Sequence, residues 1–345
     1  MHNAITDVRG VRVGHSHDEI LMSGVTVIMF EQPAPASVSV LGGAPGGRDL
    51  GCLEPDAAVK SVDAIALSGG SAFGLDAASG VQAWLRERGR GLPVGSAHVP
   101  IVPGAICFDL TNGGDKSWDR YPPYRDLGYA AAQAANTDAP MLGTAGAGYG
   151  TSTVDLKGGL GSASSRSSNG FTVGAIVAVN ALGSAMIGEG PHFWAAPLEQ
   201  GDEFGGLGYP GVPVSSPLRW KGMSPSQRSP ETATTIACVA TDAALGKSEL
   251  KRIATAANAG LSRGLRISHA LMDGDTVFAA ATGAHPQVPS LADLVEIAAL
   301  AADCLARAIA RGIYHARVPA AHVNAAWSGP PAWCDLFDGT SLRRR

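Results

Sequence analysis

A pair of adjacent threonines opens the stretch of this chain that could carry chemistry. Thr234 and Thr235 join a turn-rich segment, residues 201–231, to an apolar run that ends at Asp242. If the bond before Thr234 is cut, its hydroxyl becomes a nucleophile. Its new α-amine, with a pKa near ~7.7–8, is then the nearest base. On spacing alone, an ordinary strand start with β-branched residues explains the two threonines better.

Three further polar residues lie where apolar runs begin or end. Asp273 and Asp275 flank Gly274, and their side chains point to the same side if the chain is extended. Crowding there would raise one pKa or demand a cationic partner. On spacing alone, a glycine-centred turn with both aspartates in water is favoured. Asn180 ends the apolar run 171–180, where an amide either caps a turn or donates to an oxyanion.

A lysine and a tyrosine complete the candidates. Lys157 is the only lysine between Lys116 and Lys221, and two glycines follow it. Such an isolated lysine either reaches into a cleft or stays in solvent. Tyr121 is one of several aromatic residues in the polar, turn-rich segment 108–128, which reads as an irregular loop. That loop either lines a pocket or is purely structural.

The sequence favours no cofactor. His15 and His17 share one face of an expected strand, but no cysteine cluster or H-E-x-x-H motif accompanies them. The glycine-rich stretch 68–76 follows an apolar run, yet it matches neither G-x-G-x-x-G nor G-x-x-x-x-G-K-[ST]. Close packing of a helix on a sheet is the simpler explanation of its glycines. We therefore expect neither a metal ion nor a nucleotide.

Composition restricts the class of protein and its partners. The 345 residues include 45 glycines, about twice the usual share of ~7%, and 16% are charged, against a typical ~25%. This favours tightly layered sheets and helices with part of the surface hidden in an oligomer. A net charge of −4 argues against nucleic-acid or anionic-membrane partners. Without an apolar run of ~18 residues or a leader at the N-terminus, we expect a soluble, cytoplasmic protein. The five scattered cysteines are expected to be reduced.

Alternating strands and helices must position the candidates. We expect strands over residues 8–17, 24–30, 38–41, 64–67, 171–180 and 234–242, a further strand entry over 272–278, and helices to about 88, over 247–263 and over 290–312. Ser290 is the expected N-cap of the last helix. One layered α/β domain over residues 1–345 fits this order better than two separable domains. Residues 318–345 contain several prolines and little periodicity, and form an expected irregular tail.

Several blocks in this order resemble the DmpA family, which includes D-aminopeptidases, β-peptidyl aminopeptidases and nylon-oligomer (6-aminohexanoate oligomer) endo-hydrolases. No single block is decisive, but their joint order is highly specific. The resemblance covers roughly residues 4–312. The matching blocks are residues 11–15, 24–27, 43–46, 67–75, 157–161, 179–180, 234–242 and 273–276.

The resemblance implies a four-layer αββα sandwich, made as a precursor that cuts itself and assembled as a homotetramer. The cut would fall between Ala233 and Thr234, giving an α chain of residues 1–233 and a β chain of residues 234–345. Thr234 would then attack amide bonds of short peptides, including β- and D-residues, or of 6-aminohexanoate oligomers. The family's functional groups correspond here to the oxyanion donor Asn180, to Lys157, Asp273 and Asp275, which hold and polarise the nucleophile, and to the pocket residue Tyr121.

The chain also departs from the family pattern. The nylon-oligomer branch has asparagine before the nucleophile, whereas Ala233 stands here. The glycine loop before Lys157 is similar to the aminopeptidase branch, while Thr234 and the Asp-Gly-Asp motif are similar to the nylon-oligomer branch. Two alternatives therefore stay open. One is an acyltransferase of the ornithine acetyltransferase type, and the other is an uncut, non-catalytic binding protein.

Overall fold

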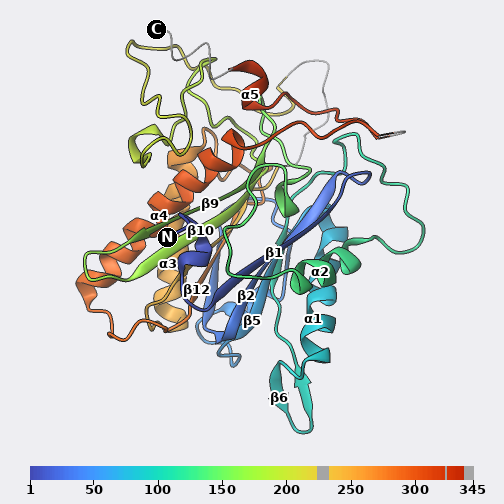
Figure 1. The fold of residues 1–345 in the computed structure, drawn as a ribbon, viewed down its shortest axis with the longest axis vertical. Helices are drawn as coiled ribbons and strands as arrows, with labels where there is room; N and C mark the ends of the chain where they lie inside the picture. Colours follow the sequence, from blue (N-terminus) through green and yellow to red (C-terminus); the bar gives the residue numbers. More distant parts are fainter. Residues whose placement is uncertain (224–232, 323–324, 338–345) are drawn as a thin grey trace.

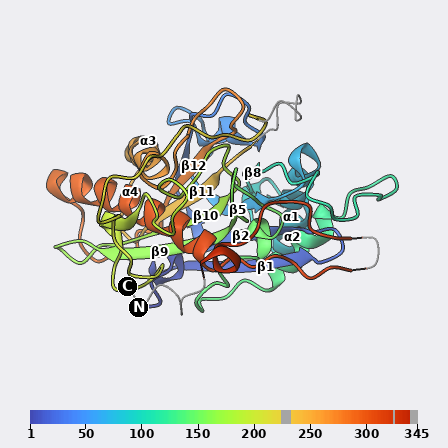
Figure 2. The ribbon, with the colours of Figure 1, turned by 90° about the horizontal axis from the view of Figure 1, so that it is seen from above.

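Two five-stranded sheets lie face to face between two pairs of helices in the computed structural model, which describes residues 1–223, 233–322 and 325–337. Figure 1 shows α1 and α2 on one side of the molecule and α3 and α4 on the other, and the view from above in Figure 2 shows the sheets between them. The expected αββα sandwich is confirmed. No helix in the described part of the chain has the length and hydropathy to cross a membrane.

The first sheet has the strand order β1-β2-β5-β8-β4 and the second has the order β3-β12-β11-β10-β9. The strands of the first are β1 (Val11–Asp18), β2 (Ser23–Ala34), β4 (Gly47–Arg48), β5 (Val62–Ser68) and β8 (Gly104–Ile106), and those of the second are β3 (Ala36–Val40), β9 (Gly159–Arg166), β10 (Thr172–Val179), β11 (Ile236–Thr241) and β12 (Thr276–Ala281). The hairpin β6 (Leu92–Val94) and β7 (Ala97–Val99) projects from the end of α1. The α-helices are α1 (Ala77–Glu87), α2 (Tyr124–Gln133), α3 (Lys247–Gly264), α4 (Leu291–Tyr314) and α5 (Trp333–Leu336), and short 3-10 turns cover Ile5–Asp7, Leu50–Leu53, Ser71–Asp76, Gly146–Gly148 and Ala196–Leu198.

Alternation along the strands builds three apolar layers. On β11, Ile236 and Cys238 face the first sheet, whereas Ala237 and Val239 face α3 and α4. The strand β2 divides its residues in the same way between the other sheet and the pair α1 and α2. Because both faces of these strands are covered, they read as continuous apolar runs in the sequence.

The sequence predicts most elements to within a few residues, and Ser290 caps α4 as expected by accepting a hydrogen bond from the Asp293 amide. It misses α2, which begins inside the expected loop 108–128, because glycine and aromatic residues weaken its helical pattern. It also misses β9. Position 161 in this strand requires glycine, because α4 crosses it so closely that a Cβ atom would lie 1.8 Å from the carbonyl oxygen of Ala308.

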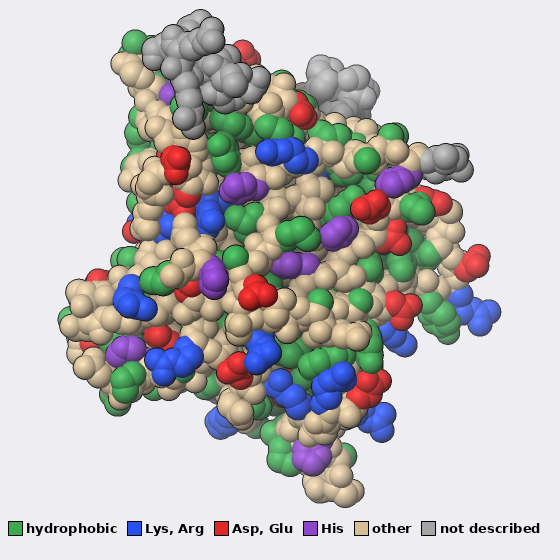
Figure 3. Space-filling view, in the orientation of Figure 1, with side chains coloured by type: hydrophobic (Ala, Val, Ile, Leu, Met, Phe, Trp, Pro, Cys, Tyr) green, Lys and Arg blue, Asp and Glu red, His purple; other side chains and the backbone are tan. Residues whose placement is uncertain are grey.

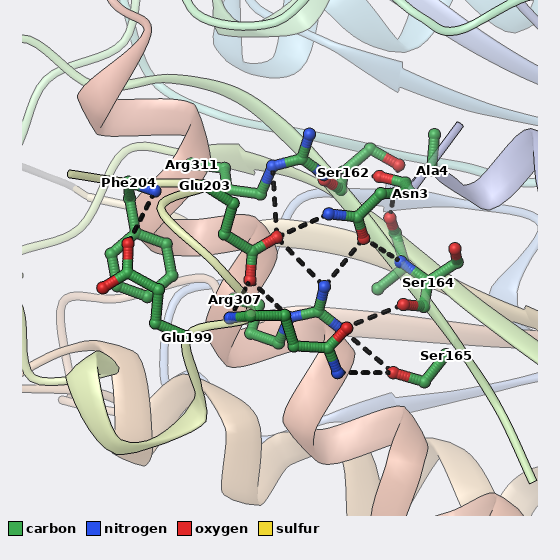
Figure 4. Close-up of polar contacts among 12 residues, drawn as sticks. Asn3, Ala4, Ser162, Ser164, Ser165, Glu199, Glu203, Phe204, Arg307 and Arg311 are labelled. Atoms are coloured by element: carbon green, nitrogen blue, oxygen red, sulfur yellow. Dashed lines mark hydrogen bonds and ion pairs between the residues drawn. The ribbon is translucent and has the colours of Figure 1, made fainter. Parts of the chain in front are cut away.

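A buried ion pair joins α4 to the irregular segment that follows the 3-10 turn Ala196–Leu198. Arg307 of α4 is 1% exposed and forms hydrogen bonds through Nε and Nη2 to the Glu203 carboxylate, at 2.6 and 3.0 Å. Figure 4 shows Asn3, from the N-terminal segment, bridging the same two side chains. Burial raises the pKa of Glu203, but the hydrogen bond and charge of Arg307, together with hydrogen bonds from Asn3 and the Gln200 amide, lower it overall.

Breaking this pair is expected to destabilise the protein by roughly 3–5 kcal/mol, since one charge would stay buried without its partner. The variant is Glu203→Gln, measured as the free energy of unfolding in urea. Glu31→Gln removes half of the exposed Arg12–Glu31 pair and is the matched control, expected to change stability by less than about 1 kcal/mol. Equal effects of the two substitutions would contradict the assignment.

The surface carries charges of both signs. On the face seen in Figure 3, acidic and basic side chains are interspersed, and no large area of this face has one sign. This distribution agrees with the small net charge of the sequence.

Candidate active site

Most of the candidate residues lie at one edge of the second sheet, because the directions of its strands bring their ends together there. The strands β11 and β12 pair in parallel, so that Thr234 and Thr235 before β11 lie beside the aspartates before β12. The strand β10 is antiparallel to β11 and brings Asn180, after its last residue, to the same edge. The strand β9 is antiparallel to β10 and begins there, just after Lys157.

Thr234 is buried, and its hydroxyl contacts the peptide that precedes it. Oγ1 donates a hydrogen bond of 2.6 Å to the carbonyl oxygen of Ala233. That oxygen also accepts a 2.9 Å hydrogen bond from the amide of Gly274. The amide of Thr234 donates to the carbonyl oxygen of Asn180 at 2.8 Å. The carbonyl that a self-cleaving hydroxyl would attack is therefore next to the hydroxyl and held by a donor.

Gly274 has no side chain because Thr234 occupies the space. A Cβ atom would lie 2.6 Å from Thr234 Oγ1 and 2.7 Å from the carbonyl oxygen of Ala44. Gly274→Ala is therefore expected to displace the hydroxyl and slow any cleavage before Thr234 by at least tenfold, roughly the effect of moving a reacting group by 1 Å. Time-resolved intact mass measurement follows the reaction. Gly51→Ala, whose Cβ atom would meet nothing within 4 Å, is the control, and equal rates in both variants would contradict the contact.

The two aspartates are both buried and make different contacts. Asp275 accepts the Thr235 amide at 3.0 Å, and its other oxygen lies 3.1 Å from Nδ1 of His269. Asp273 accepts hydrogen bonds from backbone amides, and burial and then the charge of Asp275 raise its pKa to about 6. The crowding expected from the sequence thus appears as a raised pKa of Asp273, and Asp275 has a titratable partner in His269. Burial lowers the pKa of His269, but the hydrogen bond and charge of Asp275, with smaller contributions from the Asn258 backbone and Asp273, raise it overall.

Asn180 holds its side-chain amide in a fixed orientation. Nδ2 donates to the carbonyl oxygen of Phe108 at 2.8 Å, and Oδ1 accepts from the amide of Ser152 at 3.0 Å and from Nζ of Lys221 at 3.3 Å. An amide nitrogen carries two hydrogens, so one remains for a further acceptor. The sequence gives no sign of Lys221, because it lies in the turn-rich connector.

Lys157 is fully buried and not solvated. Its Nζ donates to the carbonyl oxygens of Gly148, Thr151 and Gly158 at 2.9–3.2 Å. Burial lowers its pKa to about 7. A lysine with a pKa near neutrality can take up or release a proton close to neutral pH.

Tyr121 is not brought to this edge. Its side chain is 77% exposed in the segment before α2. The start of that segment does approach the site, because Phe108, Asp109, Thr111 and Asn112 line a cavity of about 420 Å³ together with Ser152 and Lys221. The role of Tyr121 remains a prediction.

The comparisons agree with this geometry. The sequence matches the model of Peptidase family S58 over residues 3–324. It is 40% identical to an uncharacterized aminopeptidase of Mycobacterium tuberculosis over 98% of each chain. It is 31% identical to a 6-aminohexanoate-oligomer endohydrolase of Kocuria sp., over 80% of this chain and 74% of that protein.

Two solved structures share the fold. A Burkholderia sp. beta-aminopeptidase has a TM-score of 0.70 and 23% identity, covering 100% of this chain and 95% of that one. The l-aminopeptidase d-ala-esterase/amidase of Ochrobactrum anthropi, described as a variant of the ntn hydrolase fold, has a TM-score of 0.71 and 19% identity, covering 99% and 93%. The chain belongs to peptidase family S58, the DmpA family, and is a hydrolase of amide bonds.

Proposed function

We propose that the chain cuts itself between Ala233 and Thr234 and that Thr234 then acts as the N-terminal nucleophile of an aminopeptidase. The observation that carries this proposal is the 2.6 Å contact between Thr234 Oγ1 and the carbonyl oxygen before it, with the Gly274 amide on the same oxygen. Both groups contact the carbonyl itself, so Ala233 supplies what the reaction needs without the side chain of an asparagine.

The self-cleavage proceeds by acyl transfer. Thr234 Oγ1 bonds to the carbonyl carbon of Ala233 while the carbonyl oxygen takes up negative charge, which the Gly274 amide stabilises. The carbon–nitrogen bond then breaks, the nitrogen takes up the proton that the hydroxyl loses, and an ester remains. Water hydrolyses the ester, leaving a carboxylate on Ala233 and a free α-amine on Thr234. The Asn180 carbonyl, which holds the Thr234 nitrogen at 2.8 Å, keeps that amine in place.

The mature site would act on a substrate amide in the same way. Thr234 Oγ1 attacks the substrate carbonyl, its own α-amine takes the proton, and the acyl-enzyme ester is hydrolysed. The second hydrogen on Asn180 Nδ2 faces the developing oxyanion. Asp275 fixes the start of β11 through the Thr235 amide, while Lys157 and Asp273 supply the titrating groups nearby.

The proposed substrates are short peptides with a free amine, since the relative that matches over 98% of both chains is named an aminopeptidase. Peptides with β- or D-residues are included because of the resemblance to the DmpA family. Oligomers of 6-aminohexanoate are the second class, from the name of the Kocuria relative. Purified protein is tested with alanine p-nitroanilide, its N-acetyl derivative and the linear 6-aminohexanoate dimer. We expect hydrolysis of the free-amine substrates only. Equal hydrolysis of the acetylated compound would contradict an aminopeptidase. Transfer of the acyl group to an added amine instead of to water would indicate an acyltransferase.

We also propose a cytoplasmic homotetramer. The low charge content supports association, as do the exposed apolar side chains of Val288, Leu291 and Val295 around the start of α4. Native mass spectrometry is expected to give four copies of the chain, and a monomer at micromolar concentration would contradict this assembly.

A further inference from the structure

The C-terminal segment 325–337 is docked on the body of the protein at both of its ends. At one end, Trp333 of α5 is 4% exposed, its Nε1 donates to the carbonyl oxygen of Pro191 at 3.1 Å, and its ring packs against Tyr314. At the other end, Ala325 is buried with Met22. The segment therefore has a fixed path between these two anchors, next to the site edge of the second sheet.

Between the anchors, the segment covers Lys157. The backbone amide of Lys157 donates to the carbonyl oxygen of Pro331 at 2.7 Å, and its Nζ lies 4.9 Å from the centre of the Trp327 ring. The indole nitrogen of Trp327 donates to the carbonyl oxygen of Pro330 at 2.9 Å, which fixes the plane of the ring. Trp327 is thus held in one orientation above a buried lysine of the site.

The same residues form a wall of the cavity of about 420 Å³. Residues 327–330 lie on one side, and residues 219–223 of the connector lie on another. From the connector, Lys221 reaches the Ser152 carbonyl oxygen at 2.9 Å and Asn180 Oδ1 at 3.3 Å. Two residues of the cavity lining, Ser152 and Lys221, thus hydrogen-bond to Asn180 Oδ1, and Trp327 belongs to the same lining.

The size and lining of the cavity fit a short peptide. Its volume lies near the lower end of the ~300–1,000 Å³ typical of ligand pockets. Trp220 and Trp327 contribute apolar surface from the connector and from the C-terminal segment, while Ser152, Arg219 and Lys221 contribute polar and charged groups to the lining. An indole that is fixed by its own hydrogen bond cannot move aside for a larger residue without losing that bond.

We propose that Trp327 is a specificity-determining residue whose indole sets the size of the peptide residue accepted next to the scissile bond. The proposal rests on the proposed function and adds the substrate pocket to it. After the cut, residues 219–223 would belong to the α chain and residues 327–330 to the β chain, so the complete pocket would require both.

Peptide binding to the uncut Thr234→Ala protein tests the proposal independently of turnover, since the cavity is present in the uncut chain. Isothermal titration with alanyl-alanine, alanyl-phenylalanine and phenylalanyl-alanine gives the preference for small over large residues on each side of the bond. Adding Trp327→Ala is expected to shift that preference toward phenylalanine by about tenfold or more on one side. Trp327→Phe, which keeps a ring, is expected to shift it by less than about threefold.

Trp84→Ala, in the same background, is the matched control. It removes a half-buried indole from α1, away from the cavity, and is expected to leave the preference unchanged. An unchanged preference in Trp327→Ala, or no binding of any dipeptide, would overturn the proposal. The outcome is separate from that of the proposed function, because self-cleavage and turnover are measured on the wild-type chain.

Discussion

Thr234→Ala is expected to abolish amide hydrolysis, with kcat/KM for alanine p-nitroanilide reduced by about 10⁴-fold or more, as when a nucleophile is removed from a comparable hydrolase. The reason is that, in the proposed mechanism, the Thr234 hydroxyl both cuts the chain and attacks the substrate. Its distance of 2.6 Å from the preceding carbonyl oxygen agrees with the first of these steps. Thr234→Ser keeps the hydroxyl and is expected to retain part of the activity.

Thr235→Val is the matched control for this substitution. Thr235 is fully buried, and its hydroxyl has no hydrogen-bond partner within the described residues, so an isosteric side chain fits the same space. We expect Thr235→Val to cut itself and to hydrolyse the substrate at close to the wild-type rate. Loss of activity in Thr235→Val, together with activity in Thr234→Ala, would show that Thr235 and not Thr234 is the nucleophile.

Lys157 is expected to make stability rise with pH. In the folded protein, burial lowers its pKa to about 7 from 10.5, while the charges of Asp109 and Cys107 raise it and that of Lys221 lowers it further. Between pH 7 and pH 10.5 the unfolded chain binds more protons at this position than the folded chain. The free energy of unfolding therefore increases from pH 7 toward pH 10, by an amount on the order of 3 kcal/mol from this residue.

The measurement compares Thr234→Ala with Thr234→Ala/Lys157→Met, so that both proteins remain uncut. Urea unfolding at pH 7, 8, 9 and 10 gives the two curves, and their difference isolates Lys157 from the other groups that titrate in this range. As the pH rises, we expect the free energy of unfolding of Thr234→Ala to increase steadily relative to that of the double variant. Two parallel curves would show that Lys157 does not hold a lowered pKa in the folded state.

Several parts of the site could be predicted from the sequence because they depend on strand ends. Thr234, Asn180 and the two aspartates each follow or precede an apolar run, and parallel or antiparallel pairing then brings such ends together. Resemblance to the DmpA family was needed to choose chemistry over a plain strand start at Thr234. The sequence also indicated that Lys157 stood apart from other lysines, but not that it was fully buried.

The remaining contacts depend on chain segments that are distant in sequence. His269 contacts Asp275 from a loop after α3, and Trp327 reaches Lys157 from the C-terminal segment. No local pattern marks either residue, because its role comes from packing between elements. The segment expected to be an irregular tail contains α5, and part of it lines the cavity. Neither feature could be predicted, because the prolines of that segment interrupt any regular pattern.

Intact mass measurement of freshly purified protein tests the central claim most directly. We expect two fragments, residues 1–233 and residues 234–345, with Thr234 at the start of the smaller one, and a single chain of 345 residues in Thr234→Ala. An uncut wild-type chain across a range of pH, or fragments from a cut at any other bond, would contradict it.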